Sequence, residues 1–179
     1  MPERFACLLL DANVVIETFR MGLWASLVER CELYVPRTVL DEAQYFLDDD
    51  QRRCGIDLDP DISSGKVFVV DANLADIHTF IAQFDAGYVE GLDAGETEAL
   101  TFLFGQESTD WHICSADAIV FRILGNATRT EQGISLEELL SSIGLGRHLK
   151  YPFNQVFRRK YSQQGFEEGL QGLGFRRRP

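Results

Sequence analysis

The sequence predicts an α/β fold, a three-layer α/β/α domain around a mostly parallel central sheet of about four to five strands. Two observations support this prediction. Short apolar runs alternate along the chain with segments whose apolar residues recur at helical spacing, as in a parallel sheet covered by helices on both faces. The 179 residues, of which 45% are hydrophobic, suffice for one hydrophobic core, and no apolar run reaches the roughly 20 residues that span a bilayer.

Four apolar runs predict the strands of this sheet. Each run is short, is rich in apolar residues and gives way to a turn or a helix start. The runs are residues 5–10, 33–35, 66–70 and 111–114. Because a helical pattern separates each run from the next, the strands are expected to pair in parallel. The first run meets Asp11 too soon to be the core of a signal peptide.

Apolar residues at helical spacing predict the helices between and after the strands. The predicted helices are residues 14–28, 38–47, 74–84, 93–104, 118–124 and 135–143. Thr38 with Asp41, and Ser135 with Glu138, have the spacing of capping boxes at helix starts. Gly144 is expected to end the last helix. Residues 48–65, rich in Asp, Gly and Pro, predict a polar and locally mobile loop.

Charge divides the sequence into a body, residues 1–146, and a tail, residues 147–179. The body holds 26 acids against 9 Lys and Arg, whereas the tail holds 8 Lys and Arg, clustered at 158–160 and 176–178, against 2 acids. The tail alternates aromatic and charged residues without a clear period, so it is expected to be an extension of unknown structure. Its positive charge could hold a backbone phosphate, neutralise the body or face an oligomer.

The four cysteines, at positions 7, 31, 54 and 114, lack the spacing of metal ligands. Reduced, mostly buried thiols are therefore expected, and they predict a cytoplasmic protein. The three histidines, at positions 78, 112 and 148, are scattered and do not indicate a zinc site.

Four acids stand where an apolar run meets a turn or where a helix begins. They are Asp11, Glu42, Glu96 and Asp117. Asp11 and Asp117 follow predicted strands, so a parallel sheet would place both at its carboxyl edge, where α/β proteins form their sites. Neighbouring carboxylates repel one another and are costly to bury, which favours a hard divalent cation with oxygen ligands, Mg²⁺ or Mn²⁺.

Helix capping is an alternative role for the two acids that follow strands. Asp11 could cap the helix after it, unless Asn13 supplies the cap and leaves the Asp11 carboxylate free. Ser115 or Asp117 could cap the helix that begins after them. The sequence leaves both roles open at both positions.

The two acids on predicted helices have competing roles as well. Asp93 and Glu96 have capping-box spacing, which alone would account for both residues. Asp41 suits a solvated helix start better than Glu42, which lies about 100° further round the helix, toward its apolar face. Glu98 is expected to be solvated, on the helix face opposite Glu96.

In their order and setting, these acids resemble the pattern of the PIN-domain nucleases over roughly residues 5–125. The matching segments are Asp11-Ala-Asn13, Val35-Pro36 followed by Glu42, Glu96 leading an Ala/Leu-rich helix, and Ser115-Ala-Asp117. The resemblance implies that residues 1–146 are a PIN-like nuclease domain. The third acid of the family is more often Asp, so Asp93 is the alternative to Glu96. The last strand of the family, after the fourth acid, has no clear counterpart in this sequence.

The resemblance implies a metal-dependent endoribonuclease that hydrolyses RNA phosphodiester bonds, with Mg²⁺ or Mn²⁺ held by Asp11, Glu42, Glu96 and Asp117. Many of these nucleases are toxins held inactive by a protein antitoxin, so an antitoxin-like partner and a homodimer are expected, and no membrane. A non-catalytic PIN-like module that binds a protein partner is the alternative. A phosphatase with Asp11 as nucleophile is disfavoured, because Asn13 stands where that class has a second Asp.

Overall fold

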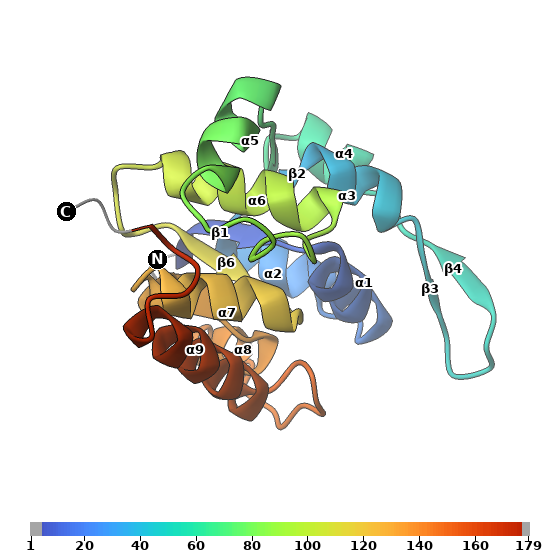
Figure 1. The fold of residues 1–179 in the computed structure, drawn as a ribbon. Helices are drawn as coiled ribbons and strands as arrows, with labels where there is room; N and C mark the ends of the chain where they lie inside the picture. Colours follow the sequence, from blue (N-terminus) through green and yellow to red (C-terminus); the bar gives the residue numbers. More distant parts are fainter. Residues whose placement is uncertain (1–4, 177–179) are drawn as a thin grey trace.

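The computed structural model describes residues 5–176 as an α/β protein with a five-stranded, all-parallel sheet (Figure 1). The strand order is β5-β2-β1-β6-β7. The strands are β1 (Phe5–Leu10), β2 (Cys31–Pro36), β5 (Val67–Val70), β6 (His112–Cys114) and β7 (Gly133–Ile134). The predicted fold class and the four predicted strands are confirmed. Strand β7 escapes prediction because two residues form no pattern.

Strand β1 lies at the centre of the sheet, and its residues explain why. Leu8 pairs with Leu33 of β2 on one side and with His112 of β6 on the other. Leu8, Leu9 and Leu10 are completely buried, as expected for a central parallel strand that helices cover on both faces. The strand therefore ends with Asp11 at the middle of the carboxyl edge.

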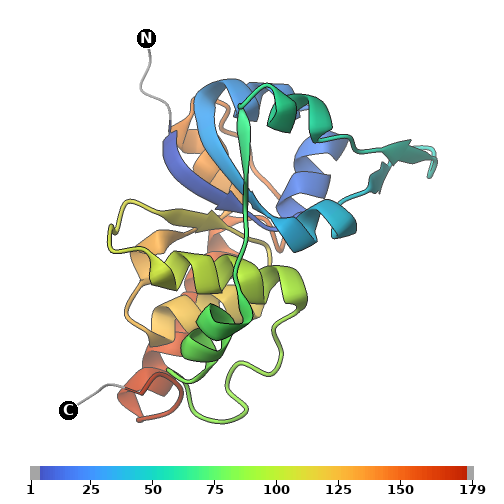
Figure 2. The ribbon, with the colours of Figure 1, turned by 90° about the horizontal axis from the view of Figure 1, so that it is seen from above.

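Helices cover both faces of the sheet (Figure 2). Leu8 and Leu10 belong to one core cluster and Leu9 to the other, because successive side chains of a strand point to opposite faces. The first face carries α1 (Ala12–Arg20), α2 (Trp24–Arg30) and α8 (Leu136–Ser142). The second face carries α5 (Leu74–Ile81), α6 (Ala94–Gly105) and α7 (Ala118–Asn126). Among the helices of residues 5–176, none has the length and apolar character to cross a membrane.

The predicted helix 14–28 is wrong as a single element, because it is two helices. Helix α1 ends at Arg20 and α2 begins at Trp24. Gly22 between them has a φ of +67°, a left-handed conformation that favours glycine and ends a helix. Apolar residues on either side of the break still face one core, so the periodicity alone conceals it.

The predicted helix 38–47 is also wrong in its start and its length. Helix α3 spans Arg37–Glu42, with Pro36 at the N-cap position. Thr38 does not cap it, because its backbone N–H and its Oγ1 both donate to Glu98 of α6, at 2.9 and 2.7 Å. Glu98 is consequently buried, which corrects the expectation that it is solvated.

The chain after α3 forms a hairpin instead of the expected helix end and loop. Strand β3 (Tyr45–Leu47) pairs antiparallel with β4 (Arg53–Gly55), and the hairpin projects from the body (Figure 1). Asp48 holds its turn by accepting from the backbone N–H groups of Asp50 and Arg52. A short helix α4 (Asp59–Ser63) follows, so the segment 48–65 is more ordered in secondary structure than its composition predicts.

The tail contains the longest helix that the structure describes, α9 (Gln155–Leu170), which packs against α7 (Figure 1). A β-carbon on Gly165 would lie 1.8 Å from the Arg122 carbonyl oxygen, and one on Gly125 would lie 2.0 Å from the Ser162 carbonyl oxygen. The two backbones therefore touch at positions where only glycine fits. Because Gly and Ser make this contact, the helix shows no apolar period and escapes prediction. Residues 177–179 of the tail lie outside the described part.

Candidate functional site

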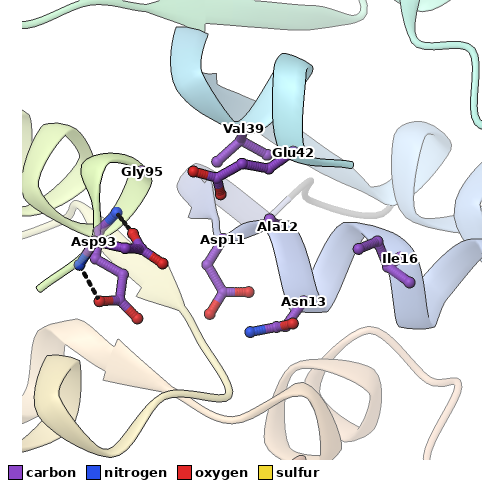
Figure 3. Close-up of a pocket in the computed structure, with 9 residues that line it drawn as sticks. Asp11, Ala12, Asn13, Ile16, Val39, Glu42, Asp93 and Gly95 are labelled. Atoms are coloured by element: carbon purple, nitrogen blue, oxygen red, sulfur yellow. Dashed lines mark hydrogen bonds between the residues drawn. The ribbon is translucent and has the colours of Figure 1, made fainter. Parts of the chain in front are cut away.

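A cavity of about 210 Å³ opens at the carboxyl edge of the sheet, beside the end of β1. Its acidic lining residues are Asp11, Glu42, Asp93 and Glu96, and Asn13 is also part of the lining. Figure 3 shows the side chains of Asp11, Glu42 and Asp93 arranged around one space. Three separate segments of the chain line it, and a fourth is adjacent because the Asp117 carboxyl hydrogen-bonds the Glu96 carboxyl.

Asp11 is both a helix cap and a buried acid of this site. Its Oδ1 accepts from the Val14 backbone N–H at 2.7 Å, so Asp11 itself caps α1 and the exposed Asn13 does not. Its Oδ2 accepts from the Ser115 hydroxyl at 2.5 Å and from the Ala116 N–H at 2.9 Å. Burial raises the pKa of Asp11 to about 6, against the opposing effect of these three donors.

Glu42 is the last residue of α3 and lies over the first turn of α6. A β-carbon on Gly95 would be 3.1 Å from Glu42 Oε2, and the Gly95 N–H donates a hydrogen bond to this carboxylate. The positive end of α6 therefore faces the negative charge of Glu42. Although Glu42 is exposed, desolvation of its carboxylate beside α6 and then the charges of Asp93 and Asp11 raise its pKa above the ordinary value.

Asp93 and Glu96 form the predicted capping box at the start of α6. Asp93 Oδ1 accepts from the Glu96 N–H at 2.8 Å, and Glu96 Oε2 accepts from the Asp93 N–H at 3.0 Å (Figure 3). Glu96 is buried, and burial, the charges of Asp117 and Asp93, and a hydrogen bond with the Asp117 carboxyl raise its pKa to about 8. Capping and membership of the acidic site thus coexist at both residues.

Asp117 caps α7 by accepting from the Ile119 N–H at 3.0 Å. Ser115 lies between the two acids that follow strands: its hydroxyl donates to Asp11 and accepts from the Asp117 N–H at 3.0 Å. This completely buried hydroxyl fixes Asp11 relative to the start of α7. The alternative cap roles of Ser115 and Asp117 are resolved in favour of Asp117.

The acids of this site lack a basic partner within residues 5–176. The ion pairs of that part of the chain involve other carboxylates, such as Asp71, Glu138 and Glu168. Removal of the carboxyls from water is the main reason why the pKa values of Asp11, Glu42 and Glu96 are raised, and the neighbouring acids raise them further. A bound cation would relieve this repulsion.

The donor set fits Mg²⁺ or Mn²⁺ in its chemistry. The oxygen atoms are carboxylates, and Asp11 fills three of its roughly four lone-pair positions with hydrogen bonds, which leaves one for a ligand. Within residues 5–176, no three His, Cys, Asp or Glu side chains are arranged to ligate one ion together. Mg²⁺ keeps several of its water ligands and is held directly by one or two carboxylates, so it does not need such a trio.

Sequence reasoning misses one supporting residue, Glu98. By accepting both donors of Thr38 it ties α3, which carries Glu42, to α6, which carries Glu96. These two hydrogen bonds hold α3 against α6 and thereby set the distance between Glu42 and Glu96. Helix phase places Glu98 away from Glu96, and nothing local in the sequence indicates that another segment covers that face.

Comparisons with protein-family models, with curated proteins and with solved structures find no match to this chain.

Proposed function

We propose that this chain is a Mg²⁺- or Mn²⁺-dependent endonuclease that hydrolyses the phosphodiester bonds of RNA at the acidic cavity. One observation carries the proposal: acids from four separate segments gather at the carboxyl edge of a parallel sheet, without a basic partner in the described residues. Structural ion-pair networks would neutralise such acids, whereas a cation-dependent site keeps them free.

Asp11, Glu42, Asp117 and Glu96 or Asp93 would hold the ion, one or two of them as direct ligands and the others through the water molecules that the ion keeps. When bound, such an ion activates a water molecule and stabilises the charge that develops on a phosphate. Ser115 and the Ala116 N–H keep the Asp11 carboxylate in one orientation. Because Asp11 and Glu96 have raised pKa values, ion binding would release protons and would strengthen as the pH rises.

The resemblance of the four motifs to PIN-domain nucleases supports RNA as the substrate. It also supports the proposals that the protein is the toxin of a toxin-antitoxin pair, that it is cytoplasmic, and that it acts as a homodimer. The alternative is a non-catalytic module that binds a protein partner. The projecting hairpin, with exposed Tyr45 and Leu47, favours that alternative because exposed apolar side chains suit a protein interface.

The test is cleavage of a labelled single-stranded RNA with Mg²⁺, with Mn²⁺ and with EDTA, alongside a DNA of the same sequence. We expect cleavage with either ion and none with EDTA. Asp11→Asn and Asp117→Asn should each reduce the rate by more than about 100-fold, since even partners of metal ligands typically contribute 10–100-fold.

Asp76→Asn is the matched control, since Asp76 is an exposed acid on α5 outside the cavity. It should cleave as the wild type does. Cleavage that persists in EDTA, or that survives Asp11→Asn and Asp117→Asn together, would contradict the proposal. Absence of cleavage by the wild type, together with binding of a protein partner that is the same in the wild type and in the acid variants, would favour the non-catalytic module.

A further inference from the structure

The tail packs α9 against α7, the helix that Asp117 caps. Phe157 of α9 packs against Phe121 of α7, Gly165 lies against Arg122 and Gly169 lies against Asn126, so the two helices run in the same direction. One helical turn before Gly165 is Tyr161, and one turn before Arg122 is Ala118. Tyr161 is therefore expected at the start of α7, beside Asp117, where Figure 1 shows the two helices side by side.

Tyr161 and Tyr151 form an aromatic pair at this position. Their hydroxyl oxygens are 3.3 Å apart, with Tyr151 donating. Both rings pack edge-on against the buried Phe157, with ring centroids 4.6 Å away for Tyr151 and 4.8 Å away for Tyr161. Phe157 thus holds both tyrosine rings in place from the protein interior. Tyr151 nevertheless keeps 54% of its surface exposed.

The electrostatic surroundings agree with this placement. The hydrogen bond from Tyr151 lowers the pKa of Tyr161 from its ordinary value, with a further contribution from Lys160, and the negative charge of Asp117 opposes the shift. This effect of Asp117 agrees with the helix register, which places Tyr161 near the start of α7. Tyr161 is therefore a neighbour of Asp117, and Asp117 in turn hydrogen-bonds the Glu96 carboxyl that lines the cavity.

Positive charge accompanies the pair. Lys160 Nζ lies 5.0 Å from the centroid of the Tyr161 ring, and both Lys160 and Arg159 are exposed. Arg158 does not add to this charge, because both its Nε and its Nη2 donate to Glu138. The rim of an otherwise acidic site thus has one cation directly at the aromatic pair.

We propose that Tyr151 and Tyr161 stack on bases of a single-stranded RNA, and that Lys160 holds a phosphate of the same strand, next to the acidic cavity. Exposed aromatic rings with a neighbouring cation are the means by which proteins hold single strands without reading their sequence. The strand would then pass from the aromatic pair into the cavity. This inference rests on the proposed nuclease function, for which it identifies the strand-binding residues.

The test measures binding of a single-stranded RNA that carries 2-aminopurine, a base whose fluorescence falls when it stacks on an aromatic ring. Ca²⁺ replaces the activating ions, and a gel verifies that the RNA stays intact. Tyr151→Ala and Tyr161→Ala should each weaken binding by about tenfold and remove the fluorescence change. Tyr151→Phe keeps the ring and should bind as the wild type does. Lys160→Ala should reduce the magnitude of the slope of log affinity against log salt concentration by about 1.

Tyr45→Ala is the matched control, because Tyr45 is an exposed tyrosine on the projecting hairpin. It should leave both readouts unchanged. Thermal unfolding verifies that Tyr161→Ala stays folded, and Tyr151→Ala, at the more exposed site, decides the question if it does not. Wild-type affinity and fluorescence change in a folded Tyr151→Ala variant would overturn the inference.

The binding and cleavage results separate this inference from the proposed function. Metal-dependent cleavage together with unchanged binding in the tyrosine variants would overturn the aromatic subsite and leave the nuclease proposal standing. Tyrosine-dependent RNA binding without cleavage would support the subsite and contradict the nuclease. No RNA binding by the wild type would overturn both.

Discussion

The Ser115 hydroxyl shows how much a single residue contributes to the candidate site. It is completely buried, donates to Asp11 and accepts from the Asp117 N–H. A hydrogen bond to a buried carboxylate stabilises its charged form and limits its rotation. Ser115 therefore controls both the charge and the orientation of Asp11 without belonging to the predicted ligands.

Ser115→Ala should weaken Mn²⁺ binding by about 10–100-fold, as expected for partners of metal ligands. Loss of the Ser115 hydrogen bond also raises the Asp11 pKa further, since that bond lowers it now. The pH at which Mn²⁺ binds half-maximally should increase, and titration calorimetry across pH measures both effects. Ser108→Ala, the same change at an exposed serine, is the control. Equal Mn²⁺ affinity in both variants would refute the role of Ser115.

Gly95→Ala should displace Glu42, because the new β-carbon would lie 3.1 Å from Glu42 Oε2. Mn²⁺ affinity should fall while the fold is kept. Gly105→Ala on the same helix meets open space, so it should leave the affinity unchanged and stabilise the fold by about 0.5–1 kcal/mol through the helix preference of alanine. Calorimetry and urea unfolding measure the two effects, and a Gly95→Ala variant with wild-type affinity would show that Glu42 is not a ligand.

Residue positions relative to strand ends were predictable from the sequence, but residue roles were not. Asp11 and Asp117 follow strands, and the parallel sheet brings both to one edge, as predicted. The sequence does not decide between a capping role and a ligand role, because the two oxygens of one carboxylate can have different partners. In Asp11, Oδ1 caps α1 and Oδ2 accepts from the Ser115 hydroxyl. Glu98 was misjudged because its partner, Thr38, is 60 residues away.

At the level of elements, the contact between α7 and α9 combines the packing of Phe121 against Phe157 with a close approach of the two backbones at two glycines. The backbones approach so closely at Gly125 and Gly165 that any β-carbon would overlap a carbonyl oxygen. Asn126 strengthens the contact by donating to the Gly165 carbonyl at 3.0 Å. Such packing leaves no apolar period, which is the physical reason why the largest helix of the tail could not be predicted.

Gly165→Ala should separate α9 from α7, since its β-carbon would lie 1.8 Å from the Arg122 carbonyl oxygen. Overpacking of this kind costs about 1–3 kcal/mol, or more where backbone must move. Urea unfolding should show this loss of free energy. Val156→Ala, at a position of the same helix that is 69% exposed, should change it by no more than about 0.5 kcal/mol. Equal stability of the two variants would contradict the described contact.

The acidic cavity makes the stability of the whole molecule depend on pH. Asp11 and Glu96 keep their protons to about pH 6 and 8 when folded, but release them near pH 4 when unfolded. The folded protein thus binds more protons between those limits, and its stability falls as the pH rises. Carboxylates with lowered pKa, such as Glu137 and Glu138, act in the opposite sense only below about pH 4.5.

The free energy of unfolding in EDTA should therefore be lower at pH 8 than at pH 5. Mg²⁺ or Mn²⁺ should reduce the difference, because a bound cation stabilises the ionised acids. Glu96→Gln should also reduce it, since an amide does not titrate. Urea unfolding at pH 5, 6, 7 and 8 measures the effect. Stability that rises with pH in EDTA would show that these acids are not protonated in the folded state.

The central position of β1 also determines when the molecule becomes complete during synthesis. Leu8 pairs with His112, so one edge of β1 stays unpaired until the chain has been synthesised about a hundred residues further. Until then a nascent chain presents the open edge of its most apolar strand, which invites pairing with other chains. Ribosome-bound chains that end before His112 should accordingly be cleaved by protease faster than chains that extend past Ile134. A protein of this topology assembles its acidic cavity only after most of it has been made.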